Sequence, residues 1–163
     1  MAGHCAIRDW DLIYVIGTSE DHDLEVLVLN ITSHHWQTLD PDLDRPKARR
    51  DFACSLSDDK ERILISGGKL NDTLAVDEFF SFDIRSHRWN QLPSSLQPRS
   101  GHVMTNYRNR TTIVGGIDAN DNSLVSMESY DNLNHWSELE DKLTKSRGNF
   151  RATQVPSSFF PQT

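Results

Sequence analysis

Three arginines recur at nearly equal intervals and are the side chains best suited to bind an anionic group. Arg50, Arg99 and Arg147 stand about 50 residues apart, with Arg49 as the alternative to the first. A guanidinium group can hold a carboxylate through two parallel N–H···O bonds. If the chain repeats as these positions indicate, the arginines surround one opening and bind acidic residues of a partner. Alternatively, they bond loop carbonyls or acidic side chains of the protein itself.

The other reactive side chains show no catalytic or metal-binding pattern. Adjacent residues of a strand point to opposite faces, so His4 and Cys5 are a poor joint ligand pair. Ser66 lies in Ser-Gly-Gly rather than in a nucleophile elbow, and no pair of acids is placed for acid and base chemistry. Other histidines stand one or two residues before a tryptophan: His34, His35, His87 and His135. We therefore expect no metal, no cofactor and no catalytic residues.

Composition and charge narrow the class of protein. With 36% hydrophobic and 9% aromatic residues, the chain of 163 residues can supply a core, which argues against disorder. A formal net charge of -7 opposes binding to nucleic acid and to anionic lipid. The apolar runs fall short of the roughly 20 residues that span a bilayer, and we see no secretory signal. We expect a cytoplasmic protein.

The cysteines and the glycosylation motifs indicate whether the protein is cytoplasmic or extracellular. Cys5 and Cys54 are too few for a disulfide framework, so we expect buried, reduced thiols. Three Asn-x-Thr motifs begin at Asn30, Asn71 and Asn109, and they would be used only in a secreted chain. These motifs leave an extracellular location as the alternative.

Three markers recur in the same order with a period of about 50 residues. A short apolar run ends in glycine, an apolar residue followed by Asp or Asn comes next, and a tryptophan closes the series. The glycines are Gly17, Gly67, Gly68, Gly115 and Gly116, the central pairs are Leu29-Asn30, Phe82-Asp83 and Tyr130-Asp131, and the tryptophans are Trp36, Trp89 and Trp136. Such a fixed period indicates one structural unit that is copied along the chain.

Each repeat contains four short apolar or alternating runs separated by turn residues, as an antiparallel meander does. We name these strands a to d, and in the second repeat they cover residues 52–57, 63–66, 78–83 and 88–92. Glycines at the end of strand b allow a positive φ and the close approach of a neighbour. The repeated tryptophan is the predicted core residue between neighbouring sheets.

The markers together resemble the kelch repeat. The double glycine, the pair Tyr130-Asp131, Trp136 six residues later and the segment 99–102, Arg-Ser-Gly-His, carry this resemblance from about residue 3 to 155. Thr18, Leu29-Asn30, Phe52 and Phe150 depart from the pattern. The family is the kelch-repeat β-propeller family of the kelch-like and F-box–kelch type.

The resemblance implies an all-β fold of four-stranded antiparallel blades. Blade 1 covers about residues 3–40, blade 2 about 50–93 and blade 3 about 100–140, with the first strand of a fourth blade at about 148–156 and a tail at 157–163. A propeller has typically four to eight blades, so three blades and one strand form a partial propeller. We expect a fragment of a longer protein, with a homodimer that completes the ring as the alternative.

The resemblance also implies a non-enzymatic module that binds another protein. In a meander the b-to-c and d-to-a loops emerge on one face, where binding sites usually lie. In kelch substrate adaptors of cullin ubiquitin ligases, arginine at the position matching Arg99 binds acidic residues of the captured peptide, and other relatives bind actin. The alternatives are a small propeller enzyme acting on a sugar or metabolite, as in galactose-oxidase-like proteins, and an extracellular adhesion module. The predicted partner-binding residues are Arg50, Lys69, Asn71, Arg99, Ser100 and Arg147.

Overall fold

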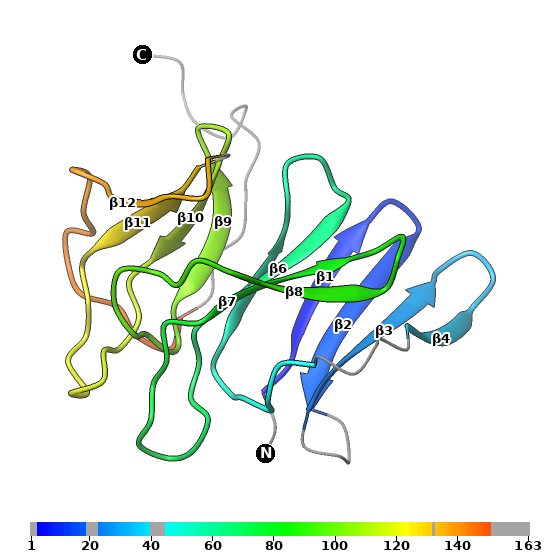
Figure 1. Ribbon diagram of the computed structural model, residues 1–163, viewed down its shortest axis with the longest axis horizontal. Helices are drawn as coiled ribbons and strands as arrows, with labels where there is room; N and C mark the ends of the chain where they lie inside the picture. The colour runs from blue at the N-terminus through cyan, green and yellow to red at the C-terminus, as the bar shows by residue number, and fades with distance from the viewer. Residues whose placement is uncertain (1–2, 19–22, 40–44, 132, 151–163) are drawn as a thin grey trace.

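The computed structural model describes residues 3–18, 23–39, 45–131 and 133–150 (Figure 1). All regular structure in these residues is β-strand, arranged in three four-stranded antiparallel sheets. The predicted all-β fold of kelch-type blades is confirmed. The described part of the chain contains no helix that is long and apolar enough to cross a membrane.

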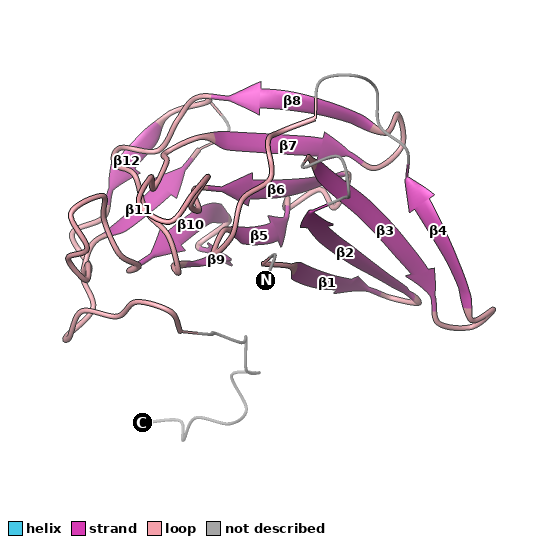
Figure 2. Cartoon of the chain, turned by 90° about the horizontal axis from the view of Figure 1, so that it is seen from below, coloured by secondary structure: helices cyan, strands magenta, loops and turns pink. Residues whose placement is uncertain are grey.

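Each sheet is a meander whose strands pair in chain order. Blade 1 comprises β1 (Cys5–Asp9), β2 (Leu12–Thr18), β3 (Leu24–Asn30) and β4 (His35–Leu39). Blade 2 comprises β5 (Ala53–Leu56), β6 (Arg62–Ser66), β7 (Phe79–Asp83) and β8 (Arg88–Leu92). Blade 3 comprises β9 (Val103–Tyr107), β10 (Arg110–Val114), β11 (Met127–Tyr130) and β12 (Trp136–Glu138). The first strands, β1, β5 and β9, lie side by side along the inner edge (Figure 2).

The register of the strands shows that the sequence markers occupy equivalent points. In each blade the apolar residue of the central pair lies opposite the tryptophan: Leu29 opposite Trp36, Phe82 opposite Trp89, and Tyr130 opposite Trp136. This common register makes the three sheets copies of one unit, so a position in one blade can be compared directly with its counterpart in another.

The first glycine of each pair makes room for the backbone that enters the next blade, and the second makes room for the backbone that enters its own blade. Gly67 and Gly68 have φ values of 58° and 96°, and Gly115 and Gly116 repeat them at 60° and 100°. A Cβ on Gly68 would lie 2.8 Å from the carbonyl oxygen of Arg50, closer than side chains approach. Gly17 does not share the positive φ, which agrees with Thr18 standing where the second glycine is missing.

Apolar side chains fill the two interfaces between neighbouring blades, which we call seam 1 (blades 1 and 2) and seam 2 (blades 2 and 3). In seam 1, β2 and β3 contribute Tyr14, Ile16 and Val26, and blade 2 contributes Ile63, Phe82 and Trp89. In seam 2, Phe79 of blade 2 meets the rings of Tyr130 and Trp136 with centroids 4.9 and 5.0 Å apart. The tryptophan of each later blade thus packs on the blade before it.

The innermost strands of seam 1 are joined covalently. Cys5 of β1 and Cys54 of β5 form a disulfide, with 6.2 Å between their Cα atoms. The expectation of reduced thiols was therefore wrong. Cys5 lies on the face of β1 that meets blade 2, and Cys54 lies on the face of β5 that meets blade 1, so the two converge across 49 residues of sequence.

The predicted fourth blade falls mostly outside the described residues. Residues 147–150 can be described, and they follow the path by which residues 99–102 enter blade 3. The amide of Gly116 donates to the carbonyl of Arg147 at 2.6 Å, as Gly68 donates to Arg99 at 2.9 Å. The rest of the predicted strand and the tail at 157–163 lie outside the described part.

Candidate functional site

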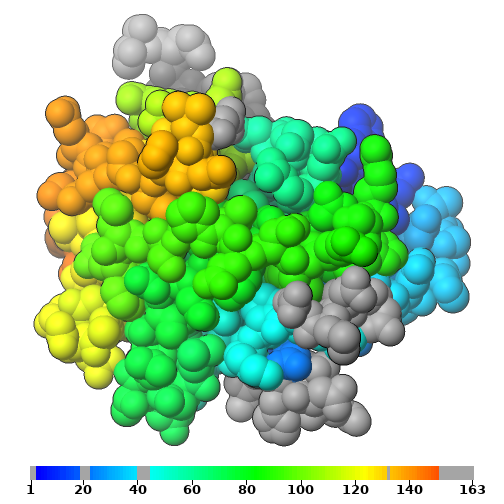
Figure 3. Space-filling model, in the orientation of Figure 1, coloured from blue at the N-terminus to red at the C-terminus, as the bar shows by residue number. Residues whose placement is uncertain are grey.

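The b-to-c and d-to-a loops emerge together at the lower side of Figure 1. We call this surface the loop face and define it by the described parts of those loops, residues 45–52, 67–78, 93–102, 115–126 and 139–150. Among the described loops, the one that follows β6 forms a lobe of its own at the lower edge of Figure 3. The a-to-b and c-to-d hairpins lie at the opposite side of the blades.

Two of the predicted binding residues meet on the loop face. Arg50 and Lys69 form a backbone bridge, with Arg50 N 3.0 Å from Lys69 O and Lys69 N 2.8 Å from Arg50 O. The Arg50 guanidinium lies 2.7 Å from Asp72, and the Lys69 ammonium lies 3.3 Å from Asp121. The two aspartate side chains are 88% and 84% exposed, respectively. Pairs with such exposed partners are worth about 0 to 1 kcal/mol, so carboxylates of a binding partner could replace them.

Asn71 shapes the loop beside these two cations. Its side-chain oxygen accepts hydrogen bonds from the amides of Thr73 and Leu74, at 3.0 and 2.8 Å. This turn leaves apolar side chains of the loop in solvent. The exposed large apolar residues of the loop face are Leu70, Leu74, Leu96 and Val125. Apolar side chains grouped with charges on a loop surface are typical of a protein-binding site.

Arg99 lies inside blade 3 rather than on its surface. The side chain has no solvent exposure, and its guanidinium pairs with the equally buried Glu128. It also donates to the carbonyl of Gly115 at 2.7 Å and to the hydroxyl of Ser126 at 3.3 Å. Burial lowers the pKa of Arg99, and the Glu128 carboxylate opposes this shift. This geometry matches the internal role given above as the alternative, and the predicted partner-binding role of Arg99 stays a prediction.

The counterpart of Arg99 in blade 2 is Arg49, not Arg50. Arg49 is buried, donates to the carbonyl of Gly67 at 3.4 Å and lies 2.9 Å from the carboxylate of Glu78. Its guanidinium also lies 5.1 Å from the centre of the Phe80 ring. Arg50, one residue later, forms the bridge to Lys69 that Ser100 forms to Ile117 in the next blade.

The remaining predicted binding residues are separated from Arg50 and Lys69. Ser100 is buried and holds the backbone bridge to Ile117. Arg147 is exposed and stands where the chain leaves blade 3. The loop face therefore brings together Arg50, Lys69 and Asn71, whereas Ser100 is enclosed and Arg147 lies at the far end.

His102 is a buried titratable residue that the sequence analysis did not single out as a site. It occupies the position of Phe52 and Phe150 in the neighbouring repeats, and its Nε2 lies 2.7 Å from the hydroxyl of Ser66. Burial, with the positive charge of Arg99 as a second cause, lowers the pKa of His102 to about 3. The imidazole is therefore neutral at physiological pH.

This buried histidine should make stability fall in mild acid. Between pH 6.5 and 3 an unfolded chain protonates the histidine but the folded protein does not, so the unfolded state binds more protons. The free energy of unfolding is thus undiminished by this effect above pH 6.5. Lowering the pH from 7.5 to 5 should reduce it by about 2 kcal/mol through His102. Urea unfolding at both pH values should show this loss in the wild type and a smaller one in His102→Phe. An equal loss in both proteins would contradict the assignment.

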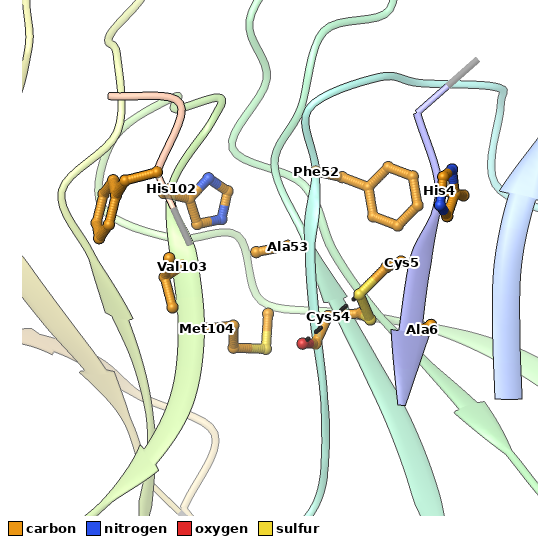
Figure 4. Close-up of a pocket in the computed structure, with 10 residues that line it drawn as sticks. His4, Cys5, Ala6, Phe52, Ala53, Cys54, His102, Val103 and Met104 are labelled. Atoms are coloured by element: carbon orange, nitrogen blue, oxygen red, sulfur yellow. Dashed lines mark hydrogen bonds between the residues drawn. A yellow bond between two sulfur atoms is a disulfide. The ribbon is translucent and has the colours of Figure 1, made fainter. Parts of the chain in front are cut away.

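The inner edges of the blades line a second feature, which we call the channel pocket. It has a volume of about 350 Å³ and lies among β1, β5, β9 and the segments that lead into them (Figure 4). Its walls include Phe52, His102, Met104 and the Cys5–Cys54 disulfide. Among the residues that the structure describes, no group of three or more His, Cys, Asp or Glu side chains is placed to hold a metal ion.

Comparisons with known proteins agree with this architecture. The family model described as the KLHDC2/KLHL20/DRC7 Kelch-repeats domain matches residues 3–156. Kelch-like protein 41a of Danio rerio is 30% identical over 71 residues, which are 43% of this chain and 12% of that protein. The chain therefore covers only a small part of this relative's length.

Proposed function

The chain belongs to the kelch-repeat family, and from this premise we propose that it binds a protein partner through its loop face. Kelch domains generally serve as non-enzymatic interaction modules. The observation that carries the proposal is the grouping of Arg50 and Lys69, each paired with an exposed aspartate, beside the exposed leucines of one loop. These groups can change partners without disturbing the blades beneath them.

The chemistry of the loop face fits an acidic segment that also carries apolar side chains. Arg50 can hold a carboxylate through two N–H groups, and Lys69 adds a second positive charge next to it. Leu70 and Leu74 offer apolar surface whose burial would stabilise the complex. The chain as a whole has a formal net charge of -7 and repels acidic segments, so this local pair of cations directs such a segment to the loop face.

Reversing the charges of the loop face should abolish partner capture. We expect Arg50→Glu with Lys69→Glu to lose the proteins that the wild type retains in quantitative affinity purification, because the variant repels carboxylates. The matched control is Lys60→Glu with Arg85→Glu, the same change of charge on the hairpins of the opposite side. This control should retain the partners. Equal retention by both variants, or equal loss, would reject the loop face as the binding surface.

The finer roles implied by the family are proposals of the same kind. A substrate-recognition role in a cullin-type ubiquitin ligase fits a face that takes an acidic segment, and actin binding is the other role. A homodimer that completes the ring also stays a prediction. The alternative of a propeller enzyme gains no support from the described part of the chain.

One observation favours the second candidate, an extracellular kelch adhesion module. Disulfides persist mainly in oxidising compartments, and Cys5 and Cys54 form one. The three glycosylation motifs also begin at turns or loops: Asn30 is the last residue of β3 and caps the β3–β4 turn, Asn71 lies on the loop face, and Asn109 lies in the β9–β10 turn. A cytoplasmic location thus stays a prediction, and glycan occupancy in a secretory host separates the two candidates.

A further inference from the structure

We propose that the Cys5–Cys54 disulfide is a thiol-exchange site, reached through the channel pocket by a small thiol of the glutathione class, and that its reduction loosens blade 1 from blade 2. This goes beyond partner binding because it concerns the inner edge of the blades and not the loop face. The two cysteines line a pocket, their crosslink holds a blade that has few other supports, and seam 2 forms without a crosslink at the corresponding place.

Access comes from the channel pocket. Cys5 and Cys54 are half-buried, and both line this pocket of about 350 Å³ (Figure 4). Thiol exchange requires a thiolate to reach one sulfur of the disulfide, so a bond that lines an open pocket can react while the protein stays folded. A disulfide enclosed in the seam core would react only after unfolding.

The crosslink holds a blade that has few other supports. Among the described residues blade 1 packs on blade 2 through one face, and its opposite face carries the half-exposed Trp36. Contacts of seam 1 that lie away from the inner edge, such as those of Tyr14 and Phe82, do not depend on the sulfur atoms. Reduction should therefore leave blade 1 folded against blade 2 but let it open more often.

The corresponding place in seam 2 shows that a kelch seam forms without a crosslink. Ala53 and Met104 occupy the positions that Cys5 and Cys54 occupy in seam 1, and both pack in the apolar cluster of seam 2. The disulfide is thus an addition to one of two similar interfaces. This comparison also supplies a matched variant, Cys5→Ala with Cys54→Met, which gives seam 1 the residue pair of seam 2.

In the reduced form, the thiol of Cys5 has a hydrogen-bond acceptor nearby. The sulfur of Cys5 lies 3.9 Å from the carbonyl oxygen of Cys54, within reach of a weak S–H···O hydrogen bond. In the exchange, a thiolate of the reductant bonds to one cysteine sulfur, and the other cysteine leaves as a thiolate. A second reductant thiolate then releases the first cysteine. The two reductant thiols thus become one disulfide and give two electrons to the protein. The two cysteine thiolates of the protein take up the two protons that the reductant thiols lose.

Hydrogen exchange at defined glutathione ratios tests the proposal on the full chain. Under reducing conditions without denaturant we expect alkylation of both cysteines and at least tenfold faster amide exchange in β1 to β4, with exchange in β9 to β12 unchanged. Cys5→Ala with Cys54→Met should exchange like the reduced wild type at every glutathione ratio.

Three results would overturn the proposal. The first is alkylation only after denaturation, and the second is a protein without the disulfide even in oxidised glutathione. The third is faster exchange in all three blades to the same degree. Since these readouts use the wild type alone, they remain decisive if the double variant does not fold.

Discussion

Replacing Trp89 with alanine should lower the free energy of unfolding by about 3 to 5 kcal/mol, whereas the same change at Trp36 should have little effect. Trp89 is 8% exposed, and its ring lies 5.1 Å from that of Phe82 within the core of seam 1. Removing a buried indole loses its apolar burial and leaves a cavity in a close-packed interface. We expect urea unfolding, followed by circular dichroism, to show this loss.

Trp36 is the matched control because it holds the same register position in blade 1. Its side chain is 51% exposed, since no described blade lies against that face. An exposed substitution usually changes stability by no more than about 0.5 kcal/mol. Equal losses at the two tryptophans would mean that they do not differ in packing, and the assignment of seam 1 would fail.

The repeat and its register could be predicted from the sequence because the markers are tied to the backbone. The glycine pairs mark the place where the backbone passes as it enters their own blade and the next, and Trp89 marks the strand that packs on the blade before it. In blade 2 the strand ranges expected from the sequence agree with β5 to β8 within one residue at each end. Each of these features depends on a short run of neighbouring residues, so it can be predicted from a single sequence.

The number of cysteines does not predict the disulfide, whereas the positions of the two cysteines in the repeat do. Cys5 and Cys54 both fall on the predicted first strands, and first strands of consecutive blades are neighbours in a propeller. When blades 1 and 2 are aligned, Cys5 corresponds to Ala53, so Cys54 lies one position later in the repeat. The two cysteines therefore point to opposite faces of their strands. The signal was present in the sequence, but it appears only once the two blades are aligned residue by residue.

The arginines show how one residue of register decides between surface and interior. Arg49 and Arg50 are adjacent, so a shift of one position exchanges a buried guanidinium for an exposed one. Aligning the segment at residue 49 with Arg99 would have identified the buried member. The repeat does not predict the acidic partner of Arg99. Glu128 on β11 occupies the position that Phe80 occupies on β7, so the acidic residue does not recur between the two blades.

Replacing Arg99 with alanine should cost about 3 to 5 kcal/mol, because it leaves a buried carboxylate without its countercharge. Glu128 is almost fully enclosed, and besides Arg99 its carboxylate accepts a hydrogen bond from the amide of Leu96, at 2.8 Å. The carbonyl of Gly115 would also lose the hydrogen bond that Arg99 donates. For a chain of this size the melting temperature should fall on the order of 10 °C.

Two further variants separate loss of the ion pair from other causes. Arg49→Ala should cost less than Arg99→Ala, because Glu78 is partly exposed and water can solvate its carboxylate. Arg99→Leu with Glu128→Leu should recover most of the loss, since apolar residues of similar size need no countercharge. If Arg99→Ala instead keeps the wild-type melting temperature but weakens partner capture, Arg99 is a binding residue and the buried ion pair contributes little. The thermal measurement thus decides between the two roles of this arginine before any partner is identified.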